Sequence, residues 1–279
     1  MAESGARLQP SADRAGSRKI WSYVLLAFGI SWGAYFFRLA GSWGPGIDEA
    51  LRLTVKFGPS LAGIGVAAAY GGAKGVWELI RRLRIPFSRP RWILLAFGLP
   101  LLILIAAVPI RALVGGPLRP FAAMSIAEGS LIFGSLLATR FFLGGGLGEE
   151  LGWRGVMLPA LQSRVGALQA SLIIGVVHGA WHLPAYGPGV LFLTLFTVSG
   201  SILFTWMYNN TEGNLFLPAL MHATANASLP FLEQLVPNID GEILFPMLVF
   251  GLWATAAWLL LWRLGPNALE PTGAGARAF

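Results

Sequence analysis

Apolar runs recur along this chain, and most are long enough to cross a bilayer as a helix, which takes about 20 residues. Short polar or basic stretches separate them. The first run follows several basic residues and could pass for a signal peptide, but it is too long and lacks a clear small-residue cleavage site. We therefore expect it to be retained as the first of eight transmembrane helices, at residues 20–39, 53–70, 93–114, 130–161, 167–184, 190–208, 214–229 and 243–264.

The composition supports this interpretation. Of 279 residues, 55% are hydrophobic and 12% charged, and the mean hydropathy is +0.65, which is more apolar surface than one soluble core could bury. The sequence predicts an all-α polytopic bundle of about eight helices around an intramembrane polar cavity. We expect a single transmembrane domain at 20–264, between a disordered basic tail at 1–19 and a short tail at 265–279. No cysteine is present, which excludes disulfides and thiol nucleophiles.

The net charge of +7 would suggest nucleic-acid binding in a soluble protein, but here the basic residues lie in loops beside apolar runs. The most basic of these loops is 71–92. The alternate loops carry more acidic residues, as the positive-inside rule demands if both termini are cytoplasmic. We therefore expect a multi-pass membrane protein with cytoplasmic termini and a lipid partner, and no nucleic-acid partner.

Two carboxylates and a guanidinium, Glu149, Glu150 and Arg154, interrupt the apolar run at 130–161. Charges placed there cost several kcal/mol unless they are paired or face a polar cavity. On a helix Glu150 and Arg154 share a face, whereas Glu149 points about 100° away. We expect Arg154 to neutralise Glu150 and Glu149 to lack a charged partner on its own face.

All the histidines of the protein, His178, His182 and His222, also fall within predicted spans. Helical spacing places His178 beside His182 and His222 beside Asn226. An uncompensated carboxylate in an apolar site is a stronger base, a histidine could help it to activate water, and a His/Asn pair could donate to an oxyanion. These are the parts needed for water to attack an amide. The same residues could instead serve as hydrogen-bonding contacts between helices.

The order of these motifs resembles one family. Glu-Glu-x-x-x-Arg, then His-Leu-Pro at the end of a span, then His-x-x-x-Asn, is similar to the CPBP intramembrane endopeptidases, which include type II CAAX prenyl proteases and the Abi and lysostaphin-resistance-like proteins. The resemblance covers a protease-like core at about 130–229. It implies an enzyme that cleaves membrane-associated proteins or peptides. It also implies the following roles: Glu149 as catalytic base, His182 as its partner in activating water, His222 and Asn226 as the oxyanion clamp, and Glu150 and Arg154 as supporting residues.

The chain departs from the family pattern at one position. His178 stands where the second motif usually has Phe, and its imidazole could be a spare ligand, a tuning group or a packing replacement for the phenyl ring. Packing is the interpretation we favour. A divalent metal ion stays open, because the glutamates and histidines could hold one although no recognised ligand spacing demands it.

Two further expectations follow from the sequence. Glu149 and His182 lie on antiparallel spans and meet at one depth only if the helix before Glu149 bends, and the glycines at 144–146 are the expected place. The zinc-helix, rhomboid-type serine and Gly-x-Gly-Asp aspartyl motifs of other intramembrane proteases are absent from the sequence. The alternatives are a transporter or proton relay that uses the same buried residues, and an inactive membrane scaffold of the same family.

Overall fold

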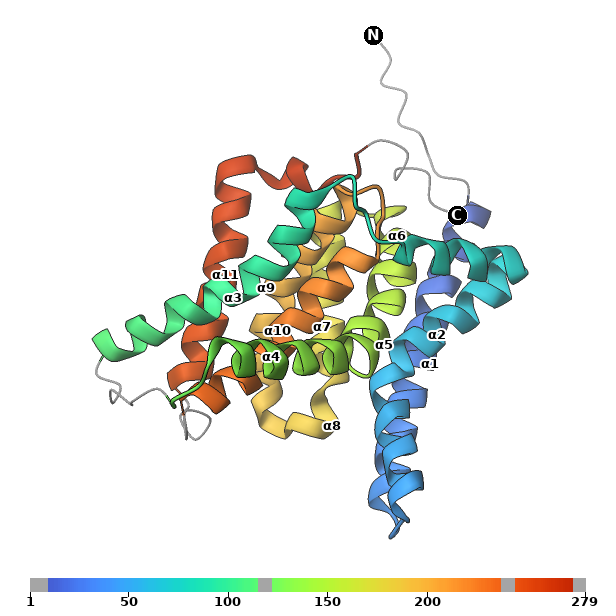
Figure 1. The fold of residues 1–279 in the computed structure, drawn as a ribbon. Coiled ribbons are helices and arrows are strands. Elements are labelled where there is room, and N and C mark those ends of the chain that lie inside the picture. Colours follow the sequence, from blue (N-terminus) through green and yellow to red (C-terminus); the bar gives the residue numbers. More distant parts are fainter. Residues whose placement is uncertain (1–9, 115–121, 237–243, 273–279) are drawn as a thin grey trace.

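The computed structural model describes residues 10–114, 122–236 and 244–272, and within these ranges the chain forms helices and no strands (Figure 1). The described residues of each expected run are mostly helical, with breaks at 143–144 and 214–215, and residue 243 lies outside the described residues. The predicted all-α class is confirmed. The α-helices are α1 (Pro10–Leu39), α2 (Pro45–Ile80), α3 (Pro90–Leu113), α4 (Ile126–Phe142), α5 (Gly145–Gly152), α6 (Leu158–Gln162), α7 (Ala167–Trp181), α8 (Leu183–Tyr186), α9 (Val190–Asn209), α10 (Phe216–Leu235) and α11 (Leu244–Leu264).

Five helical stretches are long and apolar enough to cross a membrane: Gly16–Leu39, Pro90–Leu113, Ile126–Gln162, Leu183–Asn209 and Leu244–Leu264. The shorter helix α7 is also apolar. Many large hydrophobic side chains on these helices are exposed, as expected where lipid replaces water as the solvent. The protein is therefore an integral membrane protein built from helices. The count of eight spans and the polar cavity stay predictions.

The first helix begins within the N-terminal segment that the sequence analysis treats as a tail. The tail at 1–19 was expected to be disordered, but α1 already begins at Pro10. Pro suits the first position of a helix, and the following Ala and Arg residues favour helix, so the helix of the first span extends beyond its apolar part. Residues 1–9 lie outside the described residues.

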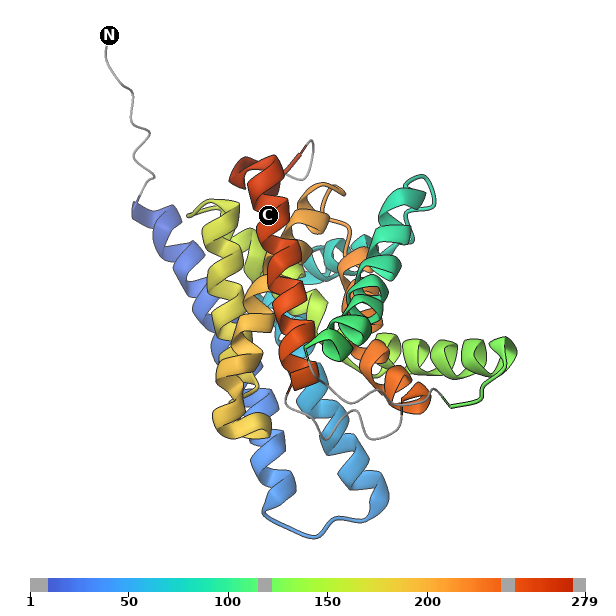
Figure 2. The ribbon, with the colours of Figure 1, turned by 90° about the vertical axis from the view of Figure 1, so that its left-hand side faces the viewer.

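The helices pack around α5 and α10. Helices α1 and α2 form a long hairpin at one side, and α7 packs against α9, which also contacts α11 (Figures 1 and 2). Helix α10 contacts α3, α4 and α5, while α5 also contacts α2. Helix α4 lies across the bundle in Figure 1 and projects to one side in Figure 2. Helix α5 thus lies between the α1–α2 hairpin and α10.

The chain bends sharply where α4 gives way to α5. Gly144, between the two helices, has extended backbone angles (φ −137°, ψ −153°). The bend expected at 144–146 is therefore confirmed, with the break at its first glycine. The later glycines let α5 approach its neighbours, because a Cβ on Gly146 would lie 3.1 Å from the carbonyl oxygen of Ala219 on α10, and one on Gly152 would collide with the carbonyl of Pro59 on α2.

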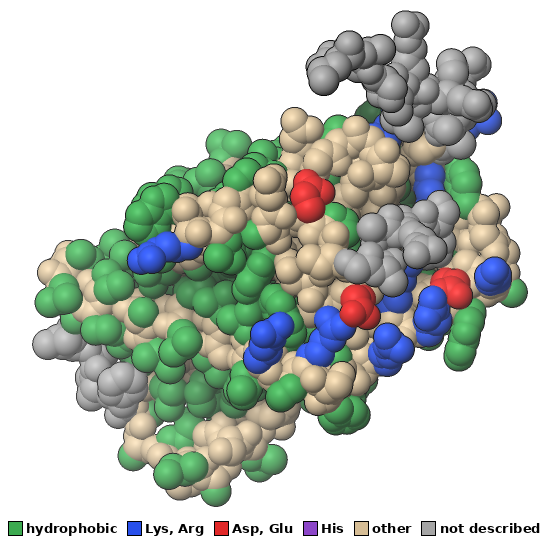
Figure 3. All heavy atoms as spheres, turned by 90° about the horizontal axis from the view of Figure 1, so that it is seen from above, with side chains coloured by type: hydrophobic (Ala, Val, Ile, Leu, Met, Phe, Trp, Pro, Cys, Tyr) green, Lys and Arg blue, Asp and Glu red, His purple; other side chains and the backbone are tan. Residues whose placement is uncertain are grey.

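Basic side chains gather at one end of the molecule. Both the start of α1 and the end of α11 lie at this end in Figures 1 and 2, and Figure 3 shows it from above with Lys and Arg side chains along one side. Here Arg81 pairs with Glu78, and Arg89 pairs with Glu212. The start of α1 and the end of α11 thus lie at the same end of the molecule.

The opposite end of the α1–α2 hairpin is held by Asp48. Its carboxylate accepts hydrogen bonds from Nε of Arg38 on α1 (2.7 Å) and Nε of Arg52 on α2 (2.9 Å). These hydrogen bonds to the two guanidinium groups hold the pKa of Asp48 below its usual range. The contact joins the two helices beyond their apolar parts.

Candidate active site

The adjacent carboxylates of α5 are both buried in the centre of the molecule. Glu149 is 6% exposed and Glu150 is fully buried. Because α5 is rich in glycine and lies between α2 and α10, the two side chains are surrounded by packed helices and leave α5 in different directions. Each carboxylate therefore has its own environment.

Glu150 lies in a paired environment. Its Oε1 atom is 3.1 Å from a guanidinium nitrogen of Arg154 and 2.7 Å from Nδ1 of His222 on α10. The guanidinium carbon of Arg154 lies 4.7 Å from the ring centre of Phe204 on α9, so that charge is held between a carboxylate and an aromatic face. The pairing of Glu150 with Arg154 expected from helical spacing is present, and His222 joins it.

Arg154 lies in a single π-helical segment, Trp153–Met157, that follows α5 directly. Such wide turns are rare and are frequent at functional sites. Here the segment is fully buried, and the indole of Trp153 stacks on the ring of His178, with ring centres 4.9 Å apart and an interplanar angle of 30°. The turn therefore contributes to both carboxylate environments, through Arg154 on one side and Trp153 on the other.

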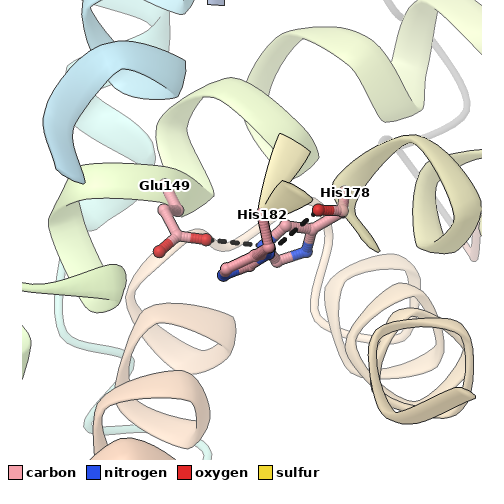
Figure 4. Close-up of side chains that lie close together, drawn as sticks. All are labelled: Glu149, His178 and His182. Atoms are coloured by element: carbon pink, nitrogen blue, oxygen red, sulfur yellow. Dashed lines mark hydrogen bonds and ion pairs between the residues drawn. The ribbon is translucent and has the colours of Figure 1, made fainter. Parts of the chain in front are cut away.

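Glu149 points toward the two histidines of α7 (Figure 4). Its Oε2 lies 2.7 Å from Nε2 of His178, and His182 lies beside them, so that one ligand atom of each residue falls within 4.8 Å of the others. The short contact has no hydrogen-bond geometry, and both of its atoms are without a hydrogen-bond partner among the described residues. Glu149 is thus buried beside two imidazoles without a donor bonded to this oxygen.

His182 directly follows α7, and its ring is held by a contact with the backbone of that helix. Its Nδ1 lies 3.0 Å from the carbonyl oxygen of His178, one helical turn earlier. Because a carbonyl can only accept, Nδ1 carries the proton and donates it, which leaves Nε2 of the neutral ring with a free lone pair. That nitrogen can accept a proton or bind a cation.

His222 and Asn226 converge on the start of α5. A Cβ placed on Gly145 would collide with Nε2 of His222 and would lie 2.9 Å from Nδ2 of Asn226. The two nitrogens therefore pack against the backbone of Gly145, in the space that a larger side chain would fill. Two neighbouring nitrogens on one face of α10 could both donate to one oxyanion.

The bend before Glu149 brings this residue to the same depth as the histidines, as the sequence analysis expects. Glu149 and His182 lie together, and the ring centre of His222 is 6.2 Å from that of His178. His178 packs against Trp153, as the favoured interpretation of this position expected, and it also makes the contact with Glu149 that packing alone does not predict.

Sequence reasoning missed Trp153, Phe204 and Gly145 as parts of this site. Gly145 belongs to a glycine run that marked a bend, but the run gave no sign of the nitrogens that fill the space beside it. Phe204 lies in a uniformly apolar run, where no pattern distinguishes it. Trp153 lies four residues after Glu149 and therefore on the same helical face. This spacing is the only sequence feature that indicates a position near the site.

Comparison with known proteins finds a family with a similar sequence in this region. Residues 121–228 match a family model described as type II CAAX prenyl endopeptidase Rce1-like. Over this segment the chain is similar to the type II CAAX prenyl endopeptidases. The matched segment includes all the site residues described above and agrees closely with the protease-like core expected at 130–229.

A curated relative carries a corresponding name. The CAAX prenyl protease 2 of Methanococcus maripaludis is 28% identical over 134 residues, which are 41% of this chain and 46% of the relative. The match thus spans about half the length of that CAAX protease.

Proposed function

We propose that this protein is an intramembrane endopeptidase that hydrolyses a peptide bond of a membrane-associated protein or peptide. One observation carries the proposal: the buried carboxylate of Glu149 lies beside two histidines, while nitrogens of His222 and Asn226 lie together beside Gly145 on the same helix α5. A base and an oxyanion clamp within one apolar bundle are the parts needed for water to attack an amide.

In the proposed reaction, Glu149 and the Nε2 lone pair of His182 hold a water molecule. Glu149 takes a proton from this water as its oxygen attacks the carbonyl carbon of the substrate. The negative charge that develops on the carbonyl oxygen accepts hydrogen bonds from His222 and Asn226. When the C–N bond breaks, the proton on Glu149 passes to the leaving amine.

The neighbouring cluster supports the clamp. Nδ1–H of His222 donates to the carboxylate of Glu150, an arrangement that favours the imidazolium form of the ring. In that form Nε2 also carries a hydrogen and can donate to an oxyanion. Arg154 pairs with the same carboxylate, so that Glu150 and Arg154 act as positioning residues that orient His222.

We propose a lipid-anchored substrate. Helices α3, α4 and α10 line an apolar cavity of about 750 Å³, and α10 is the helix that carries His222 and Asn226. An acyl or prenyl chain in this cavity would bring an attached peptide to the helix of the clamp. The name of the Methanococcus relative refers to prenylated substrates, which makes a prenylated peptide the first to test.

The test uses purified protein in proteoliposomes and an internally quenched peptide, either prenylated or bare. The proposal predicts cleavage by the wild-type protein, with a preference for the prenylated peptide, and none above background by Glu149→Gln. Equal cleavage by Glu149→Gln would overturn it.

The same liposomes separate the rival functions. A proton relay would give a proton flux that depends on Glu149 without peptide cleavage, and an inactive scaffold would give neither. Either result, with protein shown to be folded, excludes the peptidase. The Glu150–Arg154 pair and the bend before Glu149 are compatible with all of these functions. Peptide cleavage and proton flux are therefore both measured on one sample.

We also propose that both termini are cytoplasmic, on the basis of the basic end described above. The sequence contains no cysteine, so single cysteines can be introduced without a competing thiol. A cysteine at position 89 should react with an impermeant maleimide only from the cytoplasmic side, and one at position 48 only from the other. Labelling with the opposite sidedness would reverse the topology.

A further inference from the structure

A groove with a volume of about 540 Å³ follows one face of α1 near its start. Tyr70 of α2 and Arg164 of the turn between α6 and α7 also line it. The lining residues of α1 share one helical face, and they are Ser17, Arg18, Trp21, Ser22 and Leu25. None of the candidate active-site residues lines this groove, so the proposed reaction assigns it no role.

The lining of the groove changes from polar to apolar along α1. Ser17 and Arg18 precede the apolar run that begins at residue 20. Trp21 and Leu25 lie within that run, and their side chains are 63% and 69% exposed. Because a helix rises 1.5 Å per residue, the groove extends about 10 Å from Arg18 to Leu25. One end therefore suits a charged group, and the other suits an alkyl chain.

The aromatic residues of the groove indicate its depth in the membrane. Trp and Tyr are enriched where the hydrocarbon meets the lipid headgroups. Trp21 lies in the first turn of the apolar run of α1, and Tyr70 ends the run expected at 53–70. The hydroxyls of Tyr70 and Ser22 are 3.2 Å apart and form a hydrogen bond that joins α1 to α2. The charged end of the groove therefore lies at the level of the headgroups.

Two guanidinium groups from distant parts of the chain meet at the charged end. Arg18 and Arg164 both line the groove, and both side chains are exposed. Nη1 of Arg164 lies against α1, 3.1 Å from the place that a Cβ on Gly16 would take. Lys19 lies close enough to Arg82 for their charges to interact, which adds positive charge beside the groove. Guanidinium groups match the geometry of phosphate oxygens, so this end is suited to a phosphate.

We propose that this groove binds one anionic phospholipid of the surrounding leaflet. Its phosphate contacts Arg18 and Arg164, and an acyl chain follows Trp21 and Leu25 into the hydrocarbon. A free phosphate would leave the apolar end of the groove without an occupant, and a zwitterionic lipid would bring a cation toward the two arginines. The bound lipid links α1, α2 and the turn between α6 and α7. The proposal is independent of the peptidase function proposed above.

The test counts bound lipid. Delipidated protein in a neutral detergent is titrated with phosphatidylglycerol, and the lipid that each chain retains is measured by native mass spectrometry. We expect the wild type to retain one phosphatidylglycerol. Each arginine near an anionic lipid is worth about fivefold in binding, so Arg18→Gln/Arg164→Gln should bind about 30-fold more weakly and either single variant about fivefold more weakly. Arg84→Gln/Arg91→Gln removes the same charge from exposed arginines outside the groove and should bind like the wild type.

Thermal unfolding provides a second measurement and identifies the source of the phosphate. Without lipid, all the variants should unfold at the wild-type midpoint, because the substituted side chains are exposed. Phosphatidylglycerol should raise the midpoint of the wild type and of Arg84→Gln/Arg91→Gln, but not that of Arg18→Gln/Arg164→Gln. Phosphatidylcholine and glycerol phosphate should leave the wild type unchanged.

Three results would overturn the proposal. The first is a wild type that retains phosphatidylcholine as well as phosphatidylglycerol. The second is an equal rise of the midpoint with glycerol phosphate, which would indicate a site for a free phosphate only. The third is equal weakening in both double variants, which would indicate attraction to the net charge of the protein. None of these measurements involves peptide cleavage, so failure of the peptidase and failure of the lipid site are distinguishable.

Discussion

Glu149 and Glu150 are neighbours in sequence but have opposite surroundings. Oε1 of Glu150 binds both a guanidinium and an imidazole, and the carboxylate is completely buried. Oε2 of Glu149 touches an imidazole nitrogen without forming a hydrogen bond, beside a second histidine. The helices that pack against these two identical side chains thus give them different hydrogen-bond partners.

The difference shows how an apolar bundle can hold a reactive carboxylate. A buried charge must be compensated, and Glu150 is compensated within its own helix by Arg154. This leaves Glu149 to be compensated from outside, by water, substrate or a cation. Pairing with Arg154 gives Glu150 a structural role. Glu149 has no such partner and is therefore available for chemistry.

The largest loss of stability should follow removal of the guanidinium. Arg154→Met leaves the charge of Glu150 with only His222 as a partner, and breaking a buried pair costs about 3–5 kcal/mol. Unfolding in detergent by a denaturant titration measures this loss. An unfolding free energy within about 1 kcal/mol of the wild type would show that Glu150 is not held by this pair.

Removing one member of the clamp should lower the rate with less effect on folding. Asn226→Ala takes away one donor to the oxyanion, and such a loss costs about 10²–10³ in kcat. Ser228→Ala is the matched control, because Ser228 lies on the same helix and its hydroxyl donates to the carbonyl of Thr224 (2.6 Å). Equal rates for the two variants would remove Asn226 from the mechanism.

A smaller loss of rate is expected from a methyl group beside the clamp. Gly145→Ala places a Cβ where His222 and Asn226 converge, so both nitrogens must move. We expect cleavage to fall about tenfold, equivalent to roughly 1.4 kcal/mol. Gly134→Ala is the control, since its Cβ would meet nothing within 4 Å on α4. Loss of rate in the control as well would assign the effect to general helix perturbation.

The smallest effect should come from a charge pair outside the buried cluster. Glu212 pairs with Arg89 at the basic end, where their side chains are 46% and 31% exposed. Glu212→Gln should change the unfolding free energy by less than about 1 kcal/mol, because solvent screens such pairs. A loss as large as that of Arg154→Met would mean that burial does not explain the difference between the pairs.

The sequence predicts the helices and part of the site well. Apolar runs mark the helices because lipid leaves the backbone few alternatives, and helical spacing alone pairs Glu150 with Arg154. The bend before Glu149 follows from the need to bring it level with His182. Each of these predictions depends on local geometry or on a simple constraint of depth.

The remaining features depend on contacts between distant segments. The sequence does not reveal that His178 would reach Glu149, that Phe204 would cover Arg154, or that Gly145 would make room for α10. The π-helical turn at Trp153–Met157 also has no sequence signal that we recognise. These features arise from how α5 packs between α2 and α10, which spacing along one helix does not specify.

The most direct measurement compares Glu149→Gln with Glu150→Gln, recording for each the rate of peptide cleavage per folded molecule and the unfolding free energy. The account predicts that Glu149→Gln unfolds like the wild type but loses about 10²–10⁴ in rate, the range that a general base contributes. It predicts that Glu150→Gln is mainly destabilised. Wild-type cleavage by folded Glu149→Gln would contradict the account.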